Sequence, residues 1–218
     1  RMVPDCDAKK ILPNPELPVG MLSDAQYYNG LFENVKRVKG LCVFNYYERE
    51  MDDAQQLMQW AQATDKRCVF EPESAYIVYK FFGTEPNVYV PDVAGYDGKR
   101  QENWMRELLE HCTLVSRDEI CADPGRYMLQ NTYQNIMELF SLPSENAVYL
   151  HADGIPIGSF DPAYGNMRKI VEKTGFEYVT FFCENYFGHG YPQQVKWFVD
   201  QINPKVLIPC HSYNPERL

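Results

Sequence analysis

Four histidines are the side chains in this 218-residue sequence best suited to acid–base or metal chemistry. His189 lies between two glycines in FCENYFGHGYPQQ (182–194), where a strand is expected to end and a helix to begin. Gly188 and Gly190 let the backbone approach a ligand closely, and the unpaired N–H groups at a helix start favour an anion. His189 is therefore a candidate phosphate-binding or acid–base residue.

The other histidines carry weaker signals. His211 follows the expected strand KVLIPC (205–210), but zinc needs three or four ligands and the sequence contains no HxH, HxxxH or HxxEH motif. His111 lies near an expected helix C-terminus, which favours a structural role. His151 ends an expected strand, at the edge where α/β proteins bind ligands, yet a structural role is favoured for it too.

Aromatic and charged residues follow the first expected strand in NYYERE (45–50). Tyr47 could stack on a nucleic-acid base and Arg49 could contact a phosphate. Alternatively, the tyrosines pack in the core and the charged residues begin a helix. Both interpretations stay open. The turn DPGRY (123–127) is a weaker candidate for which a plain turn is favoured.

The elements that must position these residues alternate along the chain. Short apolar, β-branched runs alternate with segments of helical periodicity, and short links join them. This pattern predicts an α/β fold with a parallel, Rossmann- or flavodoxin-like sheet covered by helices on both faces. The expected strands are 41–47, 67–70, 87–90, 119–122, 146–152, 177–183 and 205–210. The expected helices are 24–39, 51–65, 73–82, 102–111, 123–140, 162–174 and 191–202.

Composition narrows the class of protein. Hydrophobic residues make up 45% and charged residues 23% of the chain, which is typical of a globular protein. No apolar run is long enough to cross a membrane and no signal peptide is visible, so a cytoplasmic location is expected. Seven cysteines without a CxxC pair suggest reduced, buried thiols. The net charge of −9 argues against a surface that binds nucleic acid throughout, but allows a local groove.

The stretch YFGHGYPQQVKWFVDQINPKVLIPCHSYNPE (186–216) resembles the closing segment of the β-CASP metallo-β-lactamase family, which includes ribonuclease J-like nucleases. A Gly-His turn opens a helix, Pro204-Lys205 starts a strand, and the strand ends in Ile-Pro-x-His. The segment 41–70 resembles the first strand–helix–strand unit of the β-CASP domain. Phe187 departs from the family, which usually has serine there, and Cys210 replaces an aliphatic residue.

The resemblance implies a zinc-dependent hydrolase that degrades or processes RNA as an exonuclease or endonuclease. His189 matches a catalytic histidine near the scissile phosphate, and His211 matches a ligand of a pair of zinc ions. The family's main metal motif, HxHxDH, does not occur in this sequence. The chain is therefore expected to be a fragment that binds no zinc tightly and is inactive alone, with the N-terminal metallo-β-lactamase half as its missing partner.

Residues 1–20 are expected to be a linker, 21–182 the β-CASP domain, and 183–218 a short returning piece of the metallo-β-lactamase fold. The expected substrate is single-stranded RNA or DNA, bound with help from Tyr47, Arg49, Gly188 and Gly190. A homodimer is included among the expected partners. Two alternatives stay open: a hydrolase of this fold with a non-nucleic-acid substrate, and a non-enzymatic α/β binding module. A nucleotide-binding module should have a glycine-rich loop after the first strand, where this sequence has NYYERE.

Overall fold

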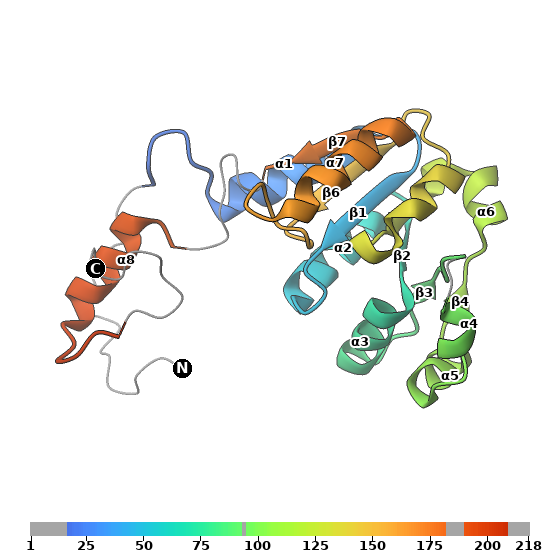
Figure 1. The fold of residues 1–218 in the computed structure, drawn as a ribbon, viewed down its shortest axis with the longest axis horizontal. Helices are drawn as coiled ribbons and strands as arrows, with labels where there is room; N and C mark the ends of the chain where they lie inside the picture. Colours follow the sequence, from blue (N-terminus) through green and yellow to red (C-terminus); the bar gives the residue numbers. More distant parts are fainter. Residues whose placement is uncertain (1–16, 93–94, 182–189, 209–218) are drawn as a thin grey trace.

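A seven-stranded, all-parallel sheet forms the centre of the protein (Figure 1). The computed structural model describes residues 17–92, 95–181 and 190–208. The strand order is β4-β3-β2-β5-β1-β6-β7, which confirms the predicted α/β fold class. The strands are β1 Cys42–Tyr46, β2 Arg67–Phe70, β3 Asn87–Val88, β4 Thr113–Leu114, β5 Tyr127–Gln130, β6 Val148–Ala152 and β7 Glu177–Thr180.

Helices cover both faces of this sheet. One core cluster joins it to the first, second, third and fifth α-helices, and a second cluster joins its other face to α6, η3 and α7. The α-helices are α1 Asp24–Arg37, α2 Met51–Ala63, α3 Pro72–Phe82, α4 Tyr96–Lys99, α5 Asn103–Glu110, α6 Arg117–Ala122, α7 Pro162–Thr174 and α8 Pro192–Ile202. Two 3-10 segments, η2 Pro124–Arg126 and η3 Tyr133–Ser141, flank β5.

The first helix packs beside the last strand of the sheet. Ser23 caps α1 in a capping box with Gln26, which satisfies donors at the start of the helix. At the other end of α1, Arg37 donates to the Glu177 carboxylate of β7 at 2.9 Å. Gly30, in the middle of α1, lies close to the Phe181 ring, since an added Cβ would be 2.9 Å from it. The chain therefore enters and leaves the sheet domain at the same edge.

Two predicted elements around residue 120 are wrong. Residues 119–122 belong to helix α6, because Ser116 and Glu119 form a capping box that starts a helix there. The predicted helix 123–140 instead contains β5, whose four residues are all buried between β1 and β2. The turn before β5 therefore lies at the amino end of a strand, where we had expected the start of a helix.

The end of the chain also departs from the prediction. Lys205–Ile208 of the expected last strand 205–210 lie in no strand, and residues 209 and 210 fall outside the described part. Among the described residues, no helix is both long and apolar enough to cross a membrane. The described cysteines form no disulfide; Cys42 and Cys68 are buried as expected, whereas Cys112 is half-buried and Cys121 is exposed.

A close contact joins the ends of β1 and β6. A Cβ added at Gly154 would lie 1.8 Å from Asn45 Oδ1 and 2.8 Å from the Asn45 backbone carbon. The Asn45 amide also donates to the Ile155 carbonyl at 3.0 Å. Glycine at position 154 thus allows the loop after β6 to close over the end of β1.

We expect Gly154→Ala to lower the free energy of unfolding by about 1–3 kcal/mol, because the added methyl group overpacks this contact. Gly165→Ala is the control, since an added Cβ at that position in α7 meets nothing within 4 Å. It should raise stability by roughly 0.5–1 kcal/mol through helix propensity. Urea unfolding followed by circular dichroism measures the stability of both variants. Equal changes in the two variants would contradict the close contact between Gly154 and Asn45.

Candidate functional site

The connections after neighbouring strands diverge at the centre of the sheet. β1 leads to α2 on one face, whereas β5, which pairs with β1, leads to η3 on the other. Such a divergence leaves a crevice at the carboxyl ends of the strands, where open α/β sheets bind ligands. Two adjoining cavities of about 400 and 210 Å³ occupy it and share Glu48, Thr132 and Gln134. We call them together the central crevice.

Glu71 is the buried carboxyl group of the central crevice. It follows β2, is 2% exposed, and accepts hydrogen bonds from Thr132 Oγ1 (2.7 Å), Thr132 N (3.1 Å) and Asn135 Nδ2 (2.6 Å). Burial raises the pKa of Glu71 to about 7, although these hydrogen bonds lower it. Glu71 therefore ties the end of β2 to the start of η3, with its acceptors already used.

Glu73 is held by helix α4 on the other side of the larger cavity. Its carboxylate accepts from Tyr96 Oη at 2.9 Å and from Lys99 Nζ at 2.6 Å. The Tyr96 hydroxyl in turn accepts from Asn135 Nδ2 at 3.2 Å. These bonds fix α4 over the crevice and compensate the charge of Glu73.

Glu48 borders both cavities and differs from these two acidic residues. Its side chain is half-buried, and among the described residues no hydrogen-bond donor reaches it. Burial raises the pKa of Glu48 and the charge of Glu73 adds to the shift, whereas Arg49 lowers it. Glu48 is thus a partly desolvated acceptor that faces open space.

Tyr47 and Arg49, both predicted to bind substrate, line the smaller cavity together. Tyr47 is half-buried, and Arg49 is exposed without a salt bridge to any described residue. Tyr46, by contrast, packs in the core against Phe70, with ring centroids 6.2 Å apart. Tyr46 therefore packs in the core, as the structural interpretation expects, whereas Tyr47 borders the crevice and its predicted substrate contact stays a prediction.

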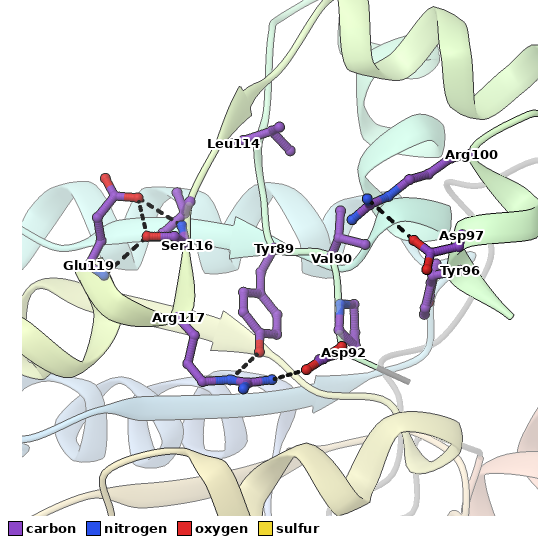
Figure 2. Close-up of a pocket in the computed structure, with 12 residues that line it drawn as sticks. Tyr89, Val90, Asp92, Tyr96, Asp97, Arg100, Leu114, Ser116, Arg117 and Glu119 are labelled. Carbon is purple, nitrogen blue, oxygen red and sulfur yellow. Dashed lines mark hydrogen bonds and ion pairs between the residues drawn. The ribbon is translucent and has the colours of Figure 1, made fainter. Parts of the chain in front are cut away.

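A second crevice of about 440 Å³ lies at the ends of β3 and β4, whose connections also diverge (Figure 2). Tyr89 Oη donates to the buried Glu138 at 2.6 Å, and Arg117 contacts both side chains at 3.3 and 3.1 Å. Arg117 also faces Asp92 at 3.7 Å, and Arg100 pairs with an aspartate of α4 at 3.4 Å. Both cations are thus compensated, and this crevice has little net positive charge.

His151 and His111, for which a structural role is favoured, both pack against aromatic rings. His151 is fully buried, with its ring stacked on Tyr178 at 6.0 Å and edge-on to Tyr164 at 5.8 Å. Burial lowers the pKa of His151 to about 4, so its ring is neutral near pH 7. His111 caps the end of α5 and stacks on Tyr79 at 5.2 Å.

The remaining predicted site residues have different outcomes. Gly188, His189 and His211 lie outside the described residues, so their predicted roles stay predictions. Gly190 is exposed and directly precedes Tyr191, the N-cap of α8. The turn 123–127 lies at the amino edge of the sheet, away from both crevices. Its Arg126 pairs with an exposed aspartate at 2.8 Å, which fits a plain turn.

The described residues do not form a zinc site. Within 17–92, 95–181 and 190–208, no group of three or more histidine, cysteine, aspartate or glutamate side chains could hold a metal ion. In the central crevice, Glu71 and Glu73 are hydrogen-bonded to protein donors, and Glu48 alone faces open space. His211, the predicted zinc ligand, lies outside the described residues, so that role stays a prediction.

Sequence reasoning missed the polar groups that shape the central crevice. Glu71, Thr132 and Asn135 each follow the carboxyl end of a strand, which is the signal that could have found them. The signal was hidden because β5 had been taken for part of a helix. Once residues 127–130 are placed in a central strand, NTYQN (131–135) falls at the ligand-binding edge.

Comparison with known proteins shows the fold and nothing more specific. No protein-family model matches the chain, and no curated protein matches it. A crystal structure of a protein of unknown function from Enterococcus faecalis V583 is similar, with a TM-score of 0.62 and 21% sequence identity. The similarity covers 95% of this chain and 45% of that one, so the chain spans less than half the length of the protein it matches.

We expect Glu71→Gln to change how stability depends on pH. The pKa of Glu71 is about 7 in the folded chain, above its ordinary value of 4.5, so the folded state retains a proton that the unfolded state releases. The resulting stabilisation is complete below pH 4.5 and is lost as the pH rises through 7. The variant has no carboxyl group to titrate at this position. The difference in free energy of unfolding between wild type and variant should therefore fall by up to about 1.4 kcal/mol per pH unit as the pH rises through this window.

Urea unfolding between about pH 5 and 8 measures this difference. Glu145→Gln is the matched control, because Glu145 is an exposed residue at the amino edge of the sheet. Its pH profile should run parallel to that of the wild type. A parallel profile for Glu71→Gln as well would contradict the raised pKa of the buried carboxyl group.

Proposed function

We propose that this chain is part of a metal-dependent phosphodiesterase that acts on single-stranded RNA. In this proposal the sheet domain covers the substrate, and the segment after β7 belongs to a second domain of the same enzyme. The proposal begins from the ordered resemblance of residues 186–216 to β-CASP nucleases. The observation that carries it is the exposure of the apolar segment around α8.

The segment 192–208 contains no buried residue, although its sequence is that of a packed element. Phe198 of α8 is 55% exposed, and Val206 and Leu207 of the expected strand are 73% and 41% exposed. Figure 1 shows α8 well away from the sheet and its covering helices. An exposed apolar helix followed by an apolar extended run marks a surface that packs against another body. This supports a second domain as its neighbour.

The position of α8 agrees with the order of motifs that the resemblance requires. Pro192 begins the helix one residue after the Gly-His-Gly sequence, and Asn203 ends it in a left-handed conformation with a φ of 47°. Pro204-Lys205 follows at once, where the family begins its strand. Asparagine is a common residue at such a helix end because it tolerates positive φ.

Within this proposal the chain's own residues bind and orient the phosphodiester. His189, just before the N-terminus of α8, donates a hydrogen bond to a phosphate oxygen or a proton to the leaving oxygen. The first N–H groups of α8 add a positive dipole end beside it. These are the roles that the chain's own side chains and backbone would have in the reaction.

The metal ions belong to the part of the proposal that concerns the whole enzyme. His211 would be the ligand that this chain contributes, and the remaining ligands would come from the second domain. When bound, the ions would supply an activated hydroxide and neutralise the phosphodiester.

A second candidate is a hydrolase of the same fold whose substrate is not a nucleic acid. The observation in its favour is the acidic lining of the central crevice, together with a net charge of −9. Carboxylates repel a phosphate backbone. A substrate that enters the central crevice completely should therefore be neutral or cationic. Cleavage assays with single-stranded RNA separate the two candidates.

We expect cleavage of labelled single-stranded RNA by the longer protein that contains this chain, and none by the chain alone. His189→Ala and His211→Ala should each reduce cleavage by roughly 10²-fold or more, because the first removes an acid–base group at the phosphate and the second a metal ligand. The isolated chain should contain less than one zinc ion per molecule by elemental analysis.

His111→Ala is the matched control, because this histidine lies at the end of α5 and stacks on Tyr79. It should leave cleavage within twofold of the wild type. Full activity in both the His189 and the His211 variants, or one tightly bound zinc ion in the isolated chain, would refute the proposal.

We also expect Phe198→Ala to act differently in the two forms of the protein. In the isolated chain this exposed side chain should change the free energy of unfolding by less than about 0.5 kcal/mol. In the longer protein, where Phe198 would pack against the second domain, the substitution should lower the free energy of unfolding by about 3 kcal/mol. Phe176→Ala, in the core and 4% exposed, should destabilise both forms. A small effect of Phe198→Ala in both forms would show that this surface stays uncovered.

A further inference from the structure

We propose that the central crevice binds a nucleobase of the substrate, guanine by preference, through Glu48. This inference rests on the proposed function, because it takes single-stranded RNA as the substrate and names the part that enters the crevice. Phosphate groups would remain outside, near Arg49 at the rim. The argument uses the size of the crevice, its free hydrogen-bonding groups and its charge.

The crevice has the size and position of a ligand site. The larger cavity measures about 400 Å³ and the smaller about 210 Å³, and both open at the carboxyl ends of β1, β2 and β5. Small-molecule sites occupy roughly 300–1,000 Å³ and occur at such points of divergence in α/β sheets. The two cavities share Glu48, so a group bound there reaches both.

Most polar groups of the crevice are already used, which identifies the ones that can bind a ligand. Glu71 accepts three hydrogen bonds and Glu73 accepts two, all from described protein groups. Glu48 and Gln134, which both line the two cavities, make no hydrogen bond with any described residue. A carboxylate partly removed from water without a donor is unfavourable, and a ligand N–H recovers that loss.

A further polar atom, poorly hydrogen-bonded, borders the same space. The hydroxyl group of Tyr46 is fully buried, and among the described residues it makes no hydrogen bond of good geometry, although the Ser74 side chain lies beside it. Tyr46 lines the smaller cavity, and Ser74, which lies near its hydroxyl, lines the larger one. Buried polar groups in proteins are almost always hydrogen-bonded, so a poorly bonded hydroxyl group beside a cavity supports binding of a polar ligand there.

The charge of the crevice selects which part of a nucleotide can enter. Glu48 and Glu73 bring negative charge to its walls, and Lys99 compensates only Glu73. A phosphate would meet like charge there, whereas a base presents neutral N–H donors. Arg49, which is exposed at the rim, is the cation that a phosphate can reach from outside.

Guanine fits a single carboxylate better than the other bases. Its N1–H and N2 amino group are adjacent donors, and an ionised carboxylate is an acceptor with two oxygens. Adenine, cytosine and uracil each place an acceptor beside their donor on this edge. The half-buried ring of Tyr47 borders the smaller cavity and offers an aromatic face, as single-stranded RNA sites commonly do.

The test is binding of free nucleosides to the isolated chain, followed by amide chemical shifts and by calorimetry. Guanosine should perturb amides of Glu48, Gln134 and Gly95, and should bind about tenfold or more tightly than adenosine or cytidine. Inosine, which lacks the N2 amino group, should bind more weakly than guanosine. Nucleosides are used because they carry no phosphate, so binding at Arg49 or at His189 does not contribute.

Glu48→Gln should weaken guanosine binding by about tenfold or more, because an amide cannot accept both donors. Glu145→Gln, at the opposite edge of the sheet, should leave it unchanged, and Gln134→Ala gives a second crevice variant without a charge change. Unchanged circular dichroism shows that the variants are folded.

Three outcomes overturn the inference: no guanosine binding, equal binding of all four nucleosides, or binding that does not depend on Glu48. Spermidine is a further probe, because Glu48-dependent binding of this amine with no guanosine binding would make the crevice a cation site. Cleavage of RNA by the longer protein is a separate measurement. It can succeed while guanosine fails to bind, and guanosine can bind if cleavage fails.

Discussion

The rest of the structure depends on the insertion of β5 between β1 and β2. The first three crossovers leave β1, β2 and β3 on one face of the sheet, and then the chain returns to the centre and continues on the other face. Two adjacent central strands therefore send their connections in opposite directions, and no side chain fills the gap between them completely. The buried Glu71 carboxyl group holds this gap at a fixed width, because its hydrogen bonds join the end of β2 to η3. The position and the acidity of the central crevice both follow from this insertion.

Much of the fold was predictable because buried strands and amphipathic helices leave strong patterns. Cys42–Tyr46 is apolar on both faces, apart from Asn45, and Met51–Ala63 repeats its apolar residues at helical spacing. The error came where two signals competed. Pro124 and Gly125 suggested the start of a helix, whereas the Ser116–Glu119 capping box had already formed one upstream. A four-residue strand such as YMLQ is too short for periodicity to decide.

The candidate site was harder to predict than the fold, for a physical reason. Tyr47 and Arg49 were found because they follow a strand that the sequence marks clearly. Glu71 and Asn135 were not, since their significance lies in a contact between segments 64 residues apart. Whether a carboxylate is saturated or free depends on its neighbours in space. Glu48 and Glu71 are the same residue type and each closely follows a strand that pairs with β5, yet Glu71 is bound by three donors whereas Glu48 faces open space.

The packing of α1 beside β7 has a mechanical consequence. Asp24 begins the first helix near the point where β7 ends, and the Arg37–Glu177 pair and the Gly30–Phe181 contact hold the two elements together. The chain therefore joins the sheet domain at two points, α1 and β7, that lie side by side at one edge of the sheet. A body attached at one edge resists translation but can rotate about that edge. If a second domain lies beyond these connections, its motion relative to the sheet is that of a hinge, and the far edge at β4 moves most.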